Sequence, residues 1–373
     1  MRAHTAVRGL LFAVLGLALL APPGGAHAVP ERDLTFMSYN LYLGSSLDPA
    51  LDVALLPPDQ QPAAFVGAVA QIYGTAVFTD FPTRAEAIAD IIAAEEPDVI
   101  GLQEVTNWIA QATAPGSTAR PPSYDFLEIL MAELASRGLD YEVAGVSDNA
   151  NIGPAPLVSP GFGCVTVVPA PDCVVTLQDR DVILVNDATP ALHWGNAQSG
   201  TFEAQQSIPL PGGLEASFGR GWVTIDAKYR GRRLHVANTH LEVSGFGDVQ
   251  EAQAQEFLAG PAEGPGADVL LGDFNSAADG STTDSYDLLT DRFRDAWAVN
   301  PQDPGDTSGQ NQALTNPTSL LHQRIDLVLV HGAVSPIEAD VVGDVPFRSQ
   351  TPQQPRPIWP SDHAGVVATL RFR

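Results

Sequence analysis

The stretch WVTIDAKYRGRRLHVANT, residues 222–239, decides between the two architectures that suit the rest of the chain. It holds two apolar strand-like segments, residues 222–227 and 234–239, and Gly231 lies in the short polar connection between them. Parallel strands need a connection of roughly a dozen residues or more, so these two are expected to form an antiparallel hairpin. Strands and helices alternate along the chain, which favours an α/β fold, and the hairpin favours two mixed sheets over a doubly wound parallel sheet.

Further segments with strand or helix periodicity lie on both sides of this hairpin. The other expected strands are residues 33–43, 99–104, 174–177, 182–185, 269–271, 325–330 and 366–370. A helix is expected to begin at Thr83, whose hydroxyl can form a capping box with Glu86, and to stop at Pro97. A second helix is expected over residues 124–135. The proline-rich insertion at residues 45–81 has no predicted structure.

The N-terminus has the parts of a secretory signal peptide. Arg2 and Arg8 precede or flank an apolar run, and an A-x-A cleavage site ends at Ala28. We expect residues 1–28 to be removed and residues 29–373 to form one exported domain; an uncleaved anchor is the alternative. The apolar run is shorter than the ~20 residues that cross a bilayer, and no later segment is long and charge-free enough, so the mature protein is expected to have no transmembrane segment.

The two cysteines, Cys164 and Cys173, lie in a stretch rich in Pro and Gly. An exported protein meets an oxidising compartment, where such a pair can close a loop. A thiolate metal site would need further Cys or nearby His partners. We therefore expect a local disulfide.

The chain is strongly acidic, with a formal net charge of −25. Without Arg2 and Arg8, 17 basic residues remain against 44 acidic ones, a net charge of −27. The only dense basic run, KYRGRR at 228–233, is interpreted as the turn of the hairpin. This charge disfavours tight nonspecific binding of nucleic acid, although bound cations would still permit local cleavage of a polyanion.

Charged and amide side chains interrupt or end the apolar strands. They are Asn40, Glu104, His240, Asp273, Asn275, Asp326, Asp362 and His363. Any one alone is more often a turn former, a helix cap or a buried, hydrogen-bonded histidine. Strand ends converge on one rim of a sheet, where open sites commonly form, so we expect these side chains to share one site.

Together these residue types suit the hydrolysis of a phosphate ester. The oxygen atoms of Asn40, Glu104 and Asp362 are suitable ligands for Mg²⁺, with Ca²⁺ or Mn²⁺ as alternatives. The attacking water needs an orienting carboxylate, which Asp273 or a His–Asp pair would provide. The remaining members are donors that could stabilise the oxygens of a pentavalent transition state, namely Asn275, His240 and His363.

The motifs around these residues occur in a fixed order along the chain. They are MSYN (37–40), PDVIGLQEV (97–105), NTHL (238–241), GDFNS (272–276), RID (324–326) and SDH (361–363). In this order they resemble the endonuclease/exonuclease/phosphatase superfamily, which includes pancreatic deoxyribonuclease, the exonuclease III type of abasic-site endonuclease, sphingomyelinases and inositol-polyphosphate 5-phosphatases. The resemblance implies a deoxyribonuclease I-like fold, a four-layer α/β/β/α sandwich with two mixed sheets packed face to face.

The resemblance also implies roles for the motif residues. Asn40, Glu104 and Asp362 would surround the metal. Asp273 would orient or deprotonate the nucleophilic water, and Asn275 would hold a phosphate oxygen.

Further roles follow for the histidine motifs. Asp326 would orient His363, whose imidazole would face the scissile phosphate. His240 matches the histidine that acts on the leaving-group side in the deoxyribonuclease branch, where it would also contact phosphate. Asp179 occupies the place of its carboxylate partner, and Arg220 resembles a phosphate-contacting arginine. The sequence leaves open which histidine is the acid and which the base.

The expected function is therefore that of a secreted, metal-dependent phosphodiesterase of nuclease type, acting as a monomer. A sphingomyelinase or phospholipase C-like enzyme that cleaves lipid head groups is the alternative. A noncatalytic binding module on the same fold is a third hypothesis, which the intact motifs disfavour. Loops at residues 45–81, 151–172 and 346–360 are expected to border the site and set its specificity.

Overall fold

Two mixed β-sheets form the centre of the computed structural model, which describes residues 33–167, 170–210, 214–348 and 357–373. The first sheet has eight strands. In order across it, seven of them are β15 (Val334–Val342), β18 (Gly365–Phe372), β1 (Asp33–Asn40), β2 (Val99–Gln103), β6 (Cys173–Asn186), β3 (Asn107–Ala112) and β4 (Tyr124–Asp125). The eighth strand, β5 (Tyr141–Pro156), pairs with β6. The second contains β13 (Arg294–Asp295), β14 (Asp326–His331), β12 (Ala267–Asp273), β11 (Arg232–His240), β10 (Gly221–Tyr229) and β7 (Leu192–Thr201). Two small ribbons pair β8 (Gln206–Leu210) with β9 (Leu214–Phe218) and β16 (Phe347–Arg348) with β17 (Pro357–Ile358).

Both sheets combine parallel and antiparallel pairs. In the first, β1 is parallel to β2 and antiparallel to β18. In the second, β11 is parallel to β12 and antiparallel to β10, with Trp222 opposite Thr239. The hairpin predicted from the short connection at Gly231 is confirmed.

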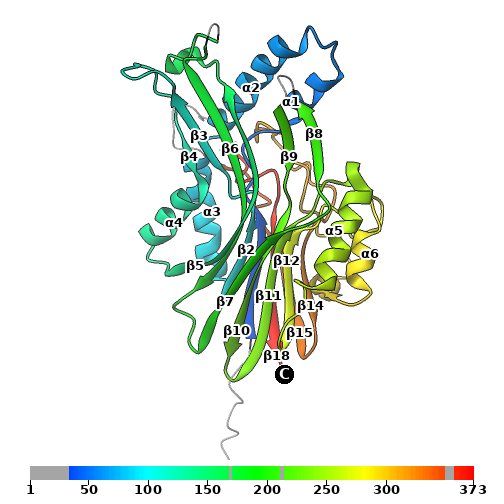
Figure 1. Cartoon of the computed structure of the whole chain (residues 1–373). Helices are drawn as coiled ribbons and strands as arrows, with labels where there is room; N and C mark the ends of the chain where they lie inside the picture. The colour runs from blue at the N-terminus through cyan, green and yellow to red at the C-terminus, as the bar shows by residue number, and fades with distance from the viewer. Residues whose placement is uncertain (1–32, 168–169, 211–213, 349–356) are drawn as a thin grey trace, which may run out of the picture. The chain divides into compact units, whose positions relative to one another are not determined.

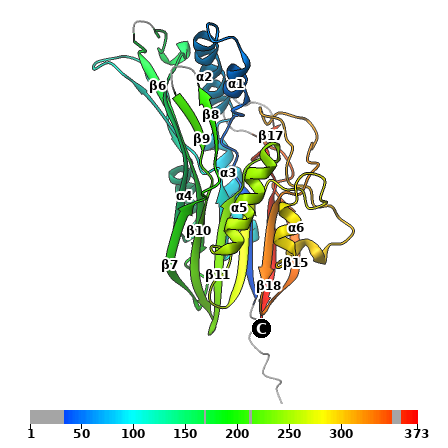
Figure 2. The same cartoon turned by 45° about the vertical axis from the view of Figure 1, so that its right-hand side comes forward.

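Helices cover the outer face of each sheet, as Figures 1 and 2 show. Those on the first sheet are α1 (Asp48–Asp52), α2 (Gln61–Phe78), α3 (Phe81–Glu95) and α4 (Phe126–Ser136). Those on the second sheet are α5 (Gly247–Ala259) and α6 (Ser285–Thr290). Short 3-10 helices lie at Val53–Leu55, Pro160–Phe162, Ser244–Phe246 and Ala296–Val299. The predicted four-layer α/β/β/α sandwich is confirmed.

The layers follow from the alternation of side chains along each strand. In β1, Leu34 and Phe36 belong to the core between the two sheets, whereas Met37 and Tyr39 belong to the core beneath α2 and α3. All four are at most 1% exposed. Strands buried on both faces in this way appear in the sequence as nearly continuous apolar runs.

Some predicted boundaries are wrong. Helix α3 begins at Phe81 rather than at Thr83, because Asp80 precedes it and Pro82 occupies its first turn. The Thr83 hydroxyl instead donates to Asp80 Oδ2 at 2.8 Å. Residues 174–177 and 182–185 are parts of the single strand β6, since β5 pairs with the polar residues between them.

The described part of the chain holds no single helix that is both long and apolar enough to cross a membrane; only α2 and α3 taken together, with a bend of 45° between them, meet that criterion. The predicted signal peptide lies outside the described residues, as do residues 349–356 of the loop predicted at 346–360.

The predicted disulfide between Cys164 and Cys173 is present. Both side chains are fully buried and pack in the core beneath the helices of the first sheet. A bond across a sequence separation of 9 closes a short loop in the unfolded chain and so lowers its entropy.

Replacing both cysteines by Ala is expected to lower the free energy of unfolding by about 2–3 kcal/mol, because the unfolded chain regains that entropy. Urea denaturation of the oxidised protein and of the double variant would measure the difference. Val165→Ala, at a position 63% exposed in the same loop, is the control and should change little. Two reactive thiols in the unfolded, unreduced protein would contradict the bond.

Candidate functional site

The predicted site residues lie at one end of the two sheets. In the second sheet His240 pairs with Asp273 and Asp273 pairs with Asp326, so the ends of three neighbouring strands carry them side by side. In the first sheet Asn40 is the last residue of β1, and Glu104 directly follows β2. The parallel pairing of β1 with β2 and of β11 with β12 explains this convergence, because parallel strands end on the same rim.

A buried amide contact joins the two sheets beneath this rim. Asn238 Nδ2 donates to the carbonyl oxygens of Leu102 at 2.9 Å and Val182 at 3.1 Å, and Gln103 Nε2 donates to Asn238 Oδ1 at 2.7 Å. A Cβ atom at Gly101 would lie 2.7 Å from Asn238 Oδ1. Glycine therefore permits the close approach of the sheets, and the hydrogen bonds fix their alignment.

Asp273 is the centre of the hydrogen-bonded cluster. Its Oδ2 accepts from Asn40 Nδ2 at 3.0 Å, and its Oδ1 accepts from the backbone N–H of Asn275 at 3.0 Å. His240 Nε2 and His363 Nε2 lie 3.5 Å and 3.8 Å from the same Oδ2. Burial, reinforced by the nearby carboxylate of Asp326, raises the pKa of Asp273 to about 6. This carboxyl is therefore suited to accept a proton near neutral pH.

Asp326 and His363 form a directly bonded pair. His363 Nδ1 lies 2.8 Å from Asp326 Oδ2, and the carboxylate is fully buried. Burial alone would lower the pKa of His363, but Asp326, Asp273 and Asp362 outweigh it and raise that pKa well above its ordinary value. His363 is therefore a cation that presents its Nε2–H to the site.

His240 has the opposite electrostatic environment. Its Nδ1 lies 2.9 Å from Arg220 Nη1, and Arg220 Nη2 lies 3.5 Å from Glu242 Oε1. Burial and then Arg220 lower the pKa of His240 well below its ordinary value. The imidazole is neutral, and because Arg220 donates to Nδ1, its proton resides on Nε2 and faces Asp273.

Asn275 lies against the same imidazole. Its Nδ2 donates to the backbone oxygen of Leu241 at 3.0 Å and lies 3.0 Å from His240 Nε2, a contact without a hydrogen bond because that nitrogen carries the proton. Its backbone has a positive φ of 50°. The conformation is one that Asn tolerates better than most residues, and it turns the amide toward the site.

Asp179 does not occupy the position that the resemblance implied. The partner of His240 Nδ1 is Arg220 rather than a carboxylate, and Asp179 instead has Thr106 Oγ1 at 3.5 Å. Burial, with Glu104 adding to the effect, raises the pKa of Asp179 to about 6. Asp179, Glu104 and Arg220 line one pocket, so Asp179 borders the site, although it is not the partner of His240 Nδ1.

The three residues predicted to hold a metal are linked through the loop that follows β1. Tyr42 N–H donates to Asn40 Oδ1 at 2.9 Å, and Leu43 N–H donates to Glu104 Oε2 at 2.6 Å. Ser361 Oγ, next to Asp362, donates to the backbone oxygen of Asn40 at 2.7 Å. The structure thus brings the predicted set together around one loop.

The chemistry of this set fits a hard divalent cation. Burial raises the pKa of Asp362 to about 7, and Glu104 adds to that rise while His363 opposes it. A buried carboxyl that faces a second carboxylate is a site whose charge a divalent cation would balance. Carboxylate and amide oxygens are also the ligands that Mg²⁺ and Ca²⁺ prefer.

A second acidic group lies close by. Potential ligand atoms of Asp273, Asp326 and His363 all lie within 4.8 Å of one another. The hydrogen bond from His363 Nδ1 to Asp326 already accounts for this proximity. The oxygen donors of the predicted set are the better match to Mg²⁺.

Arg84, which was not among the predicted site residues, holds the backbone on both sides of that set. It is fully buried, and its guanidinium donates to the carbonyl oxygens of Thr79, Leu41, Tyr42 and Pro360 at 2.6–3.1 Å. Burial lowers the pKa of Arg84 to about 10, which still leaves it charged at neutral pH. Its planar set of donors therefore ties the loop after Asn40 to the segment before Asp362.

Arg84→Lys is expected to lower the free energy of unfolding by about 2 kcal/mol, because an ammonium cannot satisfy all these carbonyl oxygens. Urea denaturation would measure the loss. Arg292→Lys, a surface arginine whose ion pair is with Glu263, is the control and should lose no more than about 0.5 kcal/mol. Equal stability of the two variants would contradict the role given to Arg84.

Glu242 is the other site residue that was not predicted. It is 3% exposed, and it follows His240 by two residues in the sequence. The one sequence signal for it was an acidic residue directly after the NTHL motif. Its pairing with Arg220 comes from a different loop and depends on the fold.

Comparison with known proteins gives a family for this arrangement. The model of the endonuclease/exonuclease/phosphatase family matches residues 37–363. No curated protein matches the sequence.

Solved structures of the same family share the fold. Family proteins from Bacteroides thetaiotaomicron and Bacteroides vulgatus are 16% and 14% identical, with TM-scores of 0.52 and 0.51; the alignments cover 92% and 91% of this chain and 99% of each of those chains. The mannosyl-6-phosphatase Bt3783 of Bacteroides thetaiotaomicron is 18% identical with a TM-score of 0.50, over 91% of this chain and 100% of that one. At these identities the likeness supports the fold alone.

The family match covers all the motifs that supply the site, from Asn40 to His363. The architecture and the match agree with the resemblance seen in the sequence. This chain belongs to the endonuclease/exonuclease/phosphatase family, whose members hydrolyse phosphate esters.

Proposed function

We propose that this protein is a divalent-metal-dependent phosphodiesterase, exported from the cell. The observation that carries the proposal is the convergence of a proton acceptor, Asp273, and a cationic donor, His363, on one rim beside the oxygen ligands of a metal site. Each of these is a component that hydrolysis of a phosphate ester needs. The signal-peptide pattern at residues 1–28 supports export.

The role proposed for each side chain follows from its charge. Asp273 would accept a proton from the water that attacks phosphorus. The leaving oxygen would depart with the electron pair of its bond to phosphorus and take up a proton from solvent to become the alcohol. His363, kept charged by Asp326, would donate a hydrogen bond to a phosphoryl oxygen. His240, neutral beside Arg220, and Asn275 would contribute uncharged donors to the same group.

Mg²⁺ is the proposed cofactor, with Ca²⁺ or Mn²⁺ as alternatives. Asn40, Glu104 and Asp362 would hold it, and it would neutralise charge on the phosphate group. The formal net charge of −25 repels an anionic substrate, and a bound cation would offset that repulsion at the site.

Removal of divalent cations with EDTA is expected to abolish hydrolysis of bis-p-nitrophenyl phosphate, and added Mg²⁺ is expected to restore it. The release of p-nitrophenol would be followed, with an apparent Mg²⁺ constant from the titration. Plasmid DNA, RNA, sphingomyelin and phosphatidylcholine, tested in parallel, separate the nuclease-type function from the head-group alternative. Full activity in EDTA would contradict metal dependence, and no activity on any ester with any of the three cations would contradict the enzyme itself.

A further inference from the structure

Two adjoining cavities lead away from the catalytic residues. The first has a volume of about 230 Å³, and its polar lining residues are Ser46, Asp48, Glu104, Asp179, Arg220 and Glu242. Most of the remaining lining is apolar. It consists of Leu47, Leu51, Ile152 and Leu177 together with Leu43, Val243 and Phe246.

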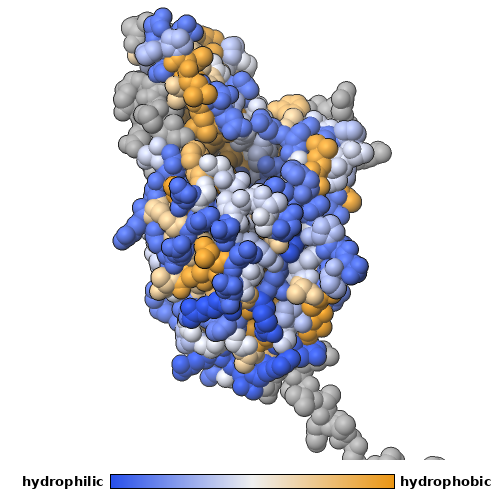
Figure 3. Space-filling model, turned by 90° about the vertical axis from the view of Figure 1, so that its right-hand side faces the viewer, coloured by the Kyte–Doolittle hydropathy of each residue, from blue (hydrophilic) through white to orange (hydrophobic). Residues whose placement is uncertain are grey.

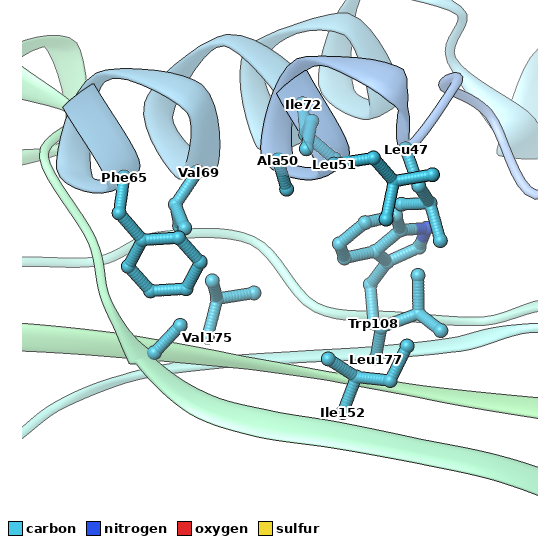
Figure 4. Close-up of a pocket in the computed structure, with 11 residues that line it drawn as sticks. Leu47, Ala50, Leu51, Phe65, Val69, Ile72, Trp108, Ile152, Val175 and Leu177 are labelled. Atoms are coloured by element: carbon cyan, nitrogen blue, oxygen red, sulfur yellow. The ribbon is translucent and has the colours of Figure 1, made fainter. Parts of the chain in front are cut away.

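The second cavity begins where the first ends. Leu47, Leu51, Ile152 and Leu177 line both, so the two spaces are neighbours across the same four side chains. Beyond them the second cavity runs between helices α1 and α2 above and strands of the first sheet below, as Figure 4 shows. In the space-filling view of Figure 3, hydrophobic surface in the upper part of the molecule ends beside a hollow.

The lining of this second cavity is apolar throughout. Deeper in, Phe65, Val69, Ile72 and Val175 complete the wall. Among the described residues that line it, the only polar side-chain atom is Trp108 Nε1, which already donates to the backbone oxygen of Leu43 at 2.8 Å. A nucleobase or a sugar would therefore find no side-chain hydrogen-bond partner, whereas a hydrocarbon group needs none.

The size of the cavity limits its occupant. Its volume is about 70 Å³. An apolar cavity of about 150 Å³ holds one benzene ring, so a space of this size holds roughly three carbon atoms. Apolar cavities of this kind stay dry and accept small hydrocarbons. The end of a short alkyl chain fits that description, with its preceding carbons against the four side chains shared with the first cavity.

The insertion at residues 45–81, which matched no known recognition pattern, builds one side of the cavity. Leu47 and Leu51 are four residues apart at helix α1, so they project on the same side. Phe65, Val69 and Ile72 have the corresponding spacing on α2. The insertion thus adds an apolar binding surface next to the reacting groups.

We infer that the apolar cavity binds the end of a short hydrocarbon substituent of the phosphate ester, of about six carbons in all, while the phosphate lies at the Glu104–Arg220 end of the first cavity. The inference rests on the proposed phosphodiesterase function. It adds the substrate class, a diester with one small apolar group.

The test is a series of alkyl p-nitrophenyl phosphates, with methyl, butyl, hexyl and dodecyl groups, hydrolysed by the full chain with Mg²⁺. We expect kcat/KM to rise about fourfold for each added CH₂ up to hexyl, as burial of a methylene predicts, and then to level off. A flat series from methyl to hexyl would overturn the inference. A rise that continues undiminished to dodecyl would overturn the limit on size.

Variants would test whether the dependence on alkyl chain length arises in the apolar cavity. Ala50 lines the cavity, and Ala50→Phe should fill it and reduce the hexyl-to-methyl ratio of kcat/KM to near one. Leu55→Phe is the matched control, because Leu55 is 84% exposed on the same insertion and should keep the wild-type ratio. If Ala50→Phe does not fold, Ile152→Phe, at a half-buried position of the same lining, takes its place. A wild-type ratio in a folded cavity variant would overturn the assignment.

A binding measurement separates this inference from the proposed function. Calorimetric titration with hexyl phosphate and methyl phosphate needs no turnover. At least tenfold tighter binding of hexyl phosphate, lost in the cavity variant, would support the cavity even if no ester were hydrolysed. Equal affinities would overturn it even if the enzyme were active.

Discussion

Asp326→Asn is expected to lower kcat by about 10³-fold while leaving the Mg²⁺ requirement nearly unchanged. The reason is the 2.8 Å contact between Asp326 Oδ2 and His363 Nδ1. The Asp326 carboxylate raises the pKa of His363. With an uncharged amide at position 326, His363 would be a neutral imidazole instead of the cation that faces the phosphate. An amide could also turn its NH₂ toward Nδ1 and select the wrong tautomer.

Kinetics over a series of Mg²⁺ concentrations would measure both parameters. Asp187→Asn, at an exposed position, is the charge-matched control and should retain wild-type turnover. Recovery of the Asp326→Asn variant simply on raising Mg²⁺ would show that Asp326 is a metal ligand, and the division of roles between the two acidic groups would then be wrong.

Glu104→Gln is expected to raise the Mg²⁺ concentration for half-maximal activity by about 100-fold or more, since a neutral amide replaces an anionic ligand of a hard cation. The side chain would keep an oxygen to accept the Leu43 N–H bond of 2.6 Å, so the loop after β1 should be retained. The loss would therefore reflect the charge at the metal site rather than the local backbone.

Titration of activity with Mg²⁺, and calorimetric titration of the metal itself, would test this. Glu128→Gln, on the exposed side of α4, is the control. A variant with the wild-type Mg²⁺ constant but low kcat would show that Glu104 acts on the substrate instead. The Asp326 and Glu104 variants should thus separate cleanly in a metal titration.

The predictable parts of the fold are the elements whose apolar residues follow the pattern of a strand or of a helix. Strands β1, β2, β11, β12 and β14 appear as apolar runs because both their faces are buried. Strand β5 was missed, since its sequence YEVAGVSDNANIGPAP alternates poorly and contains Gly and Pro. Helix α2 was missed as well, because its small apolar residues are spread around the helix and give no clear face.

The site, too, was predictable only in part. Sequence motifs placed Asn40, Asp273 and His363 correctly at strand ends, because strand ends are visible in the apolar pattern. The contacts of Arg220 with His240 and Glu242 join side chains from separate segments, so their geometry depends on strand register and on loop conformation. Neither is visible in a single sequence.

The position of β18 has a consequence for how the site is assembled. Strand β18 lies beside β1, with Thr35 and Thr369 in contact across a separation of 334 residues. Asp362 and His363 directly precede that strand. The first sheet therefore lacks an inner strand, and the site lacks two of its residues, until these distant segments pair. Closure of the first sheet by β18 and completion of the proposed active site are thus one folding event.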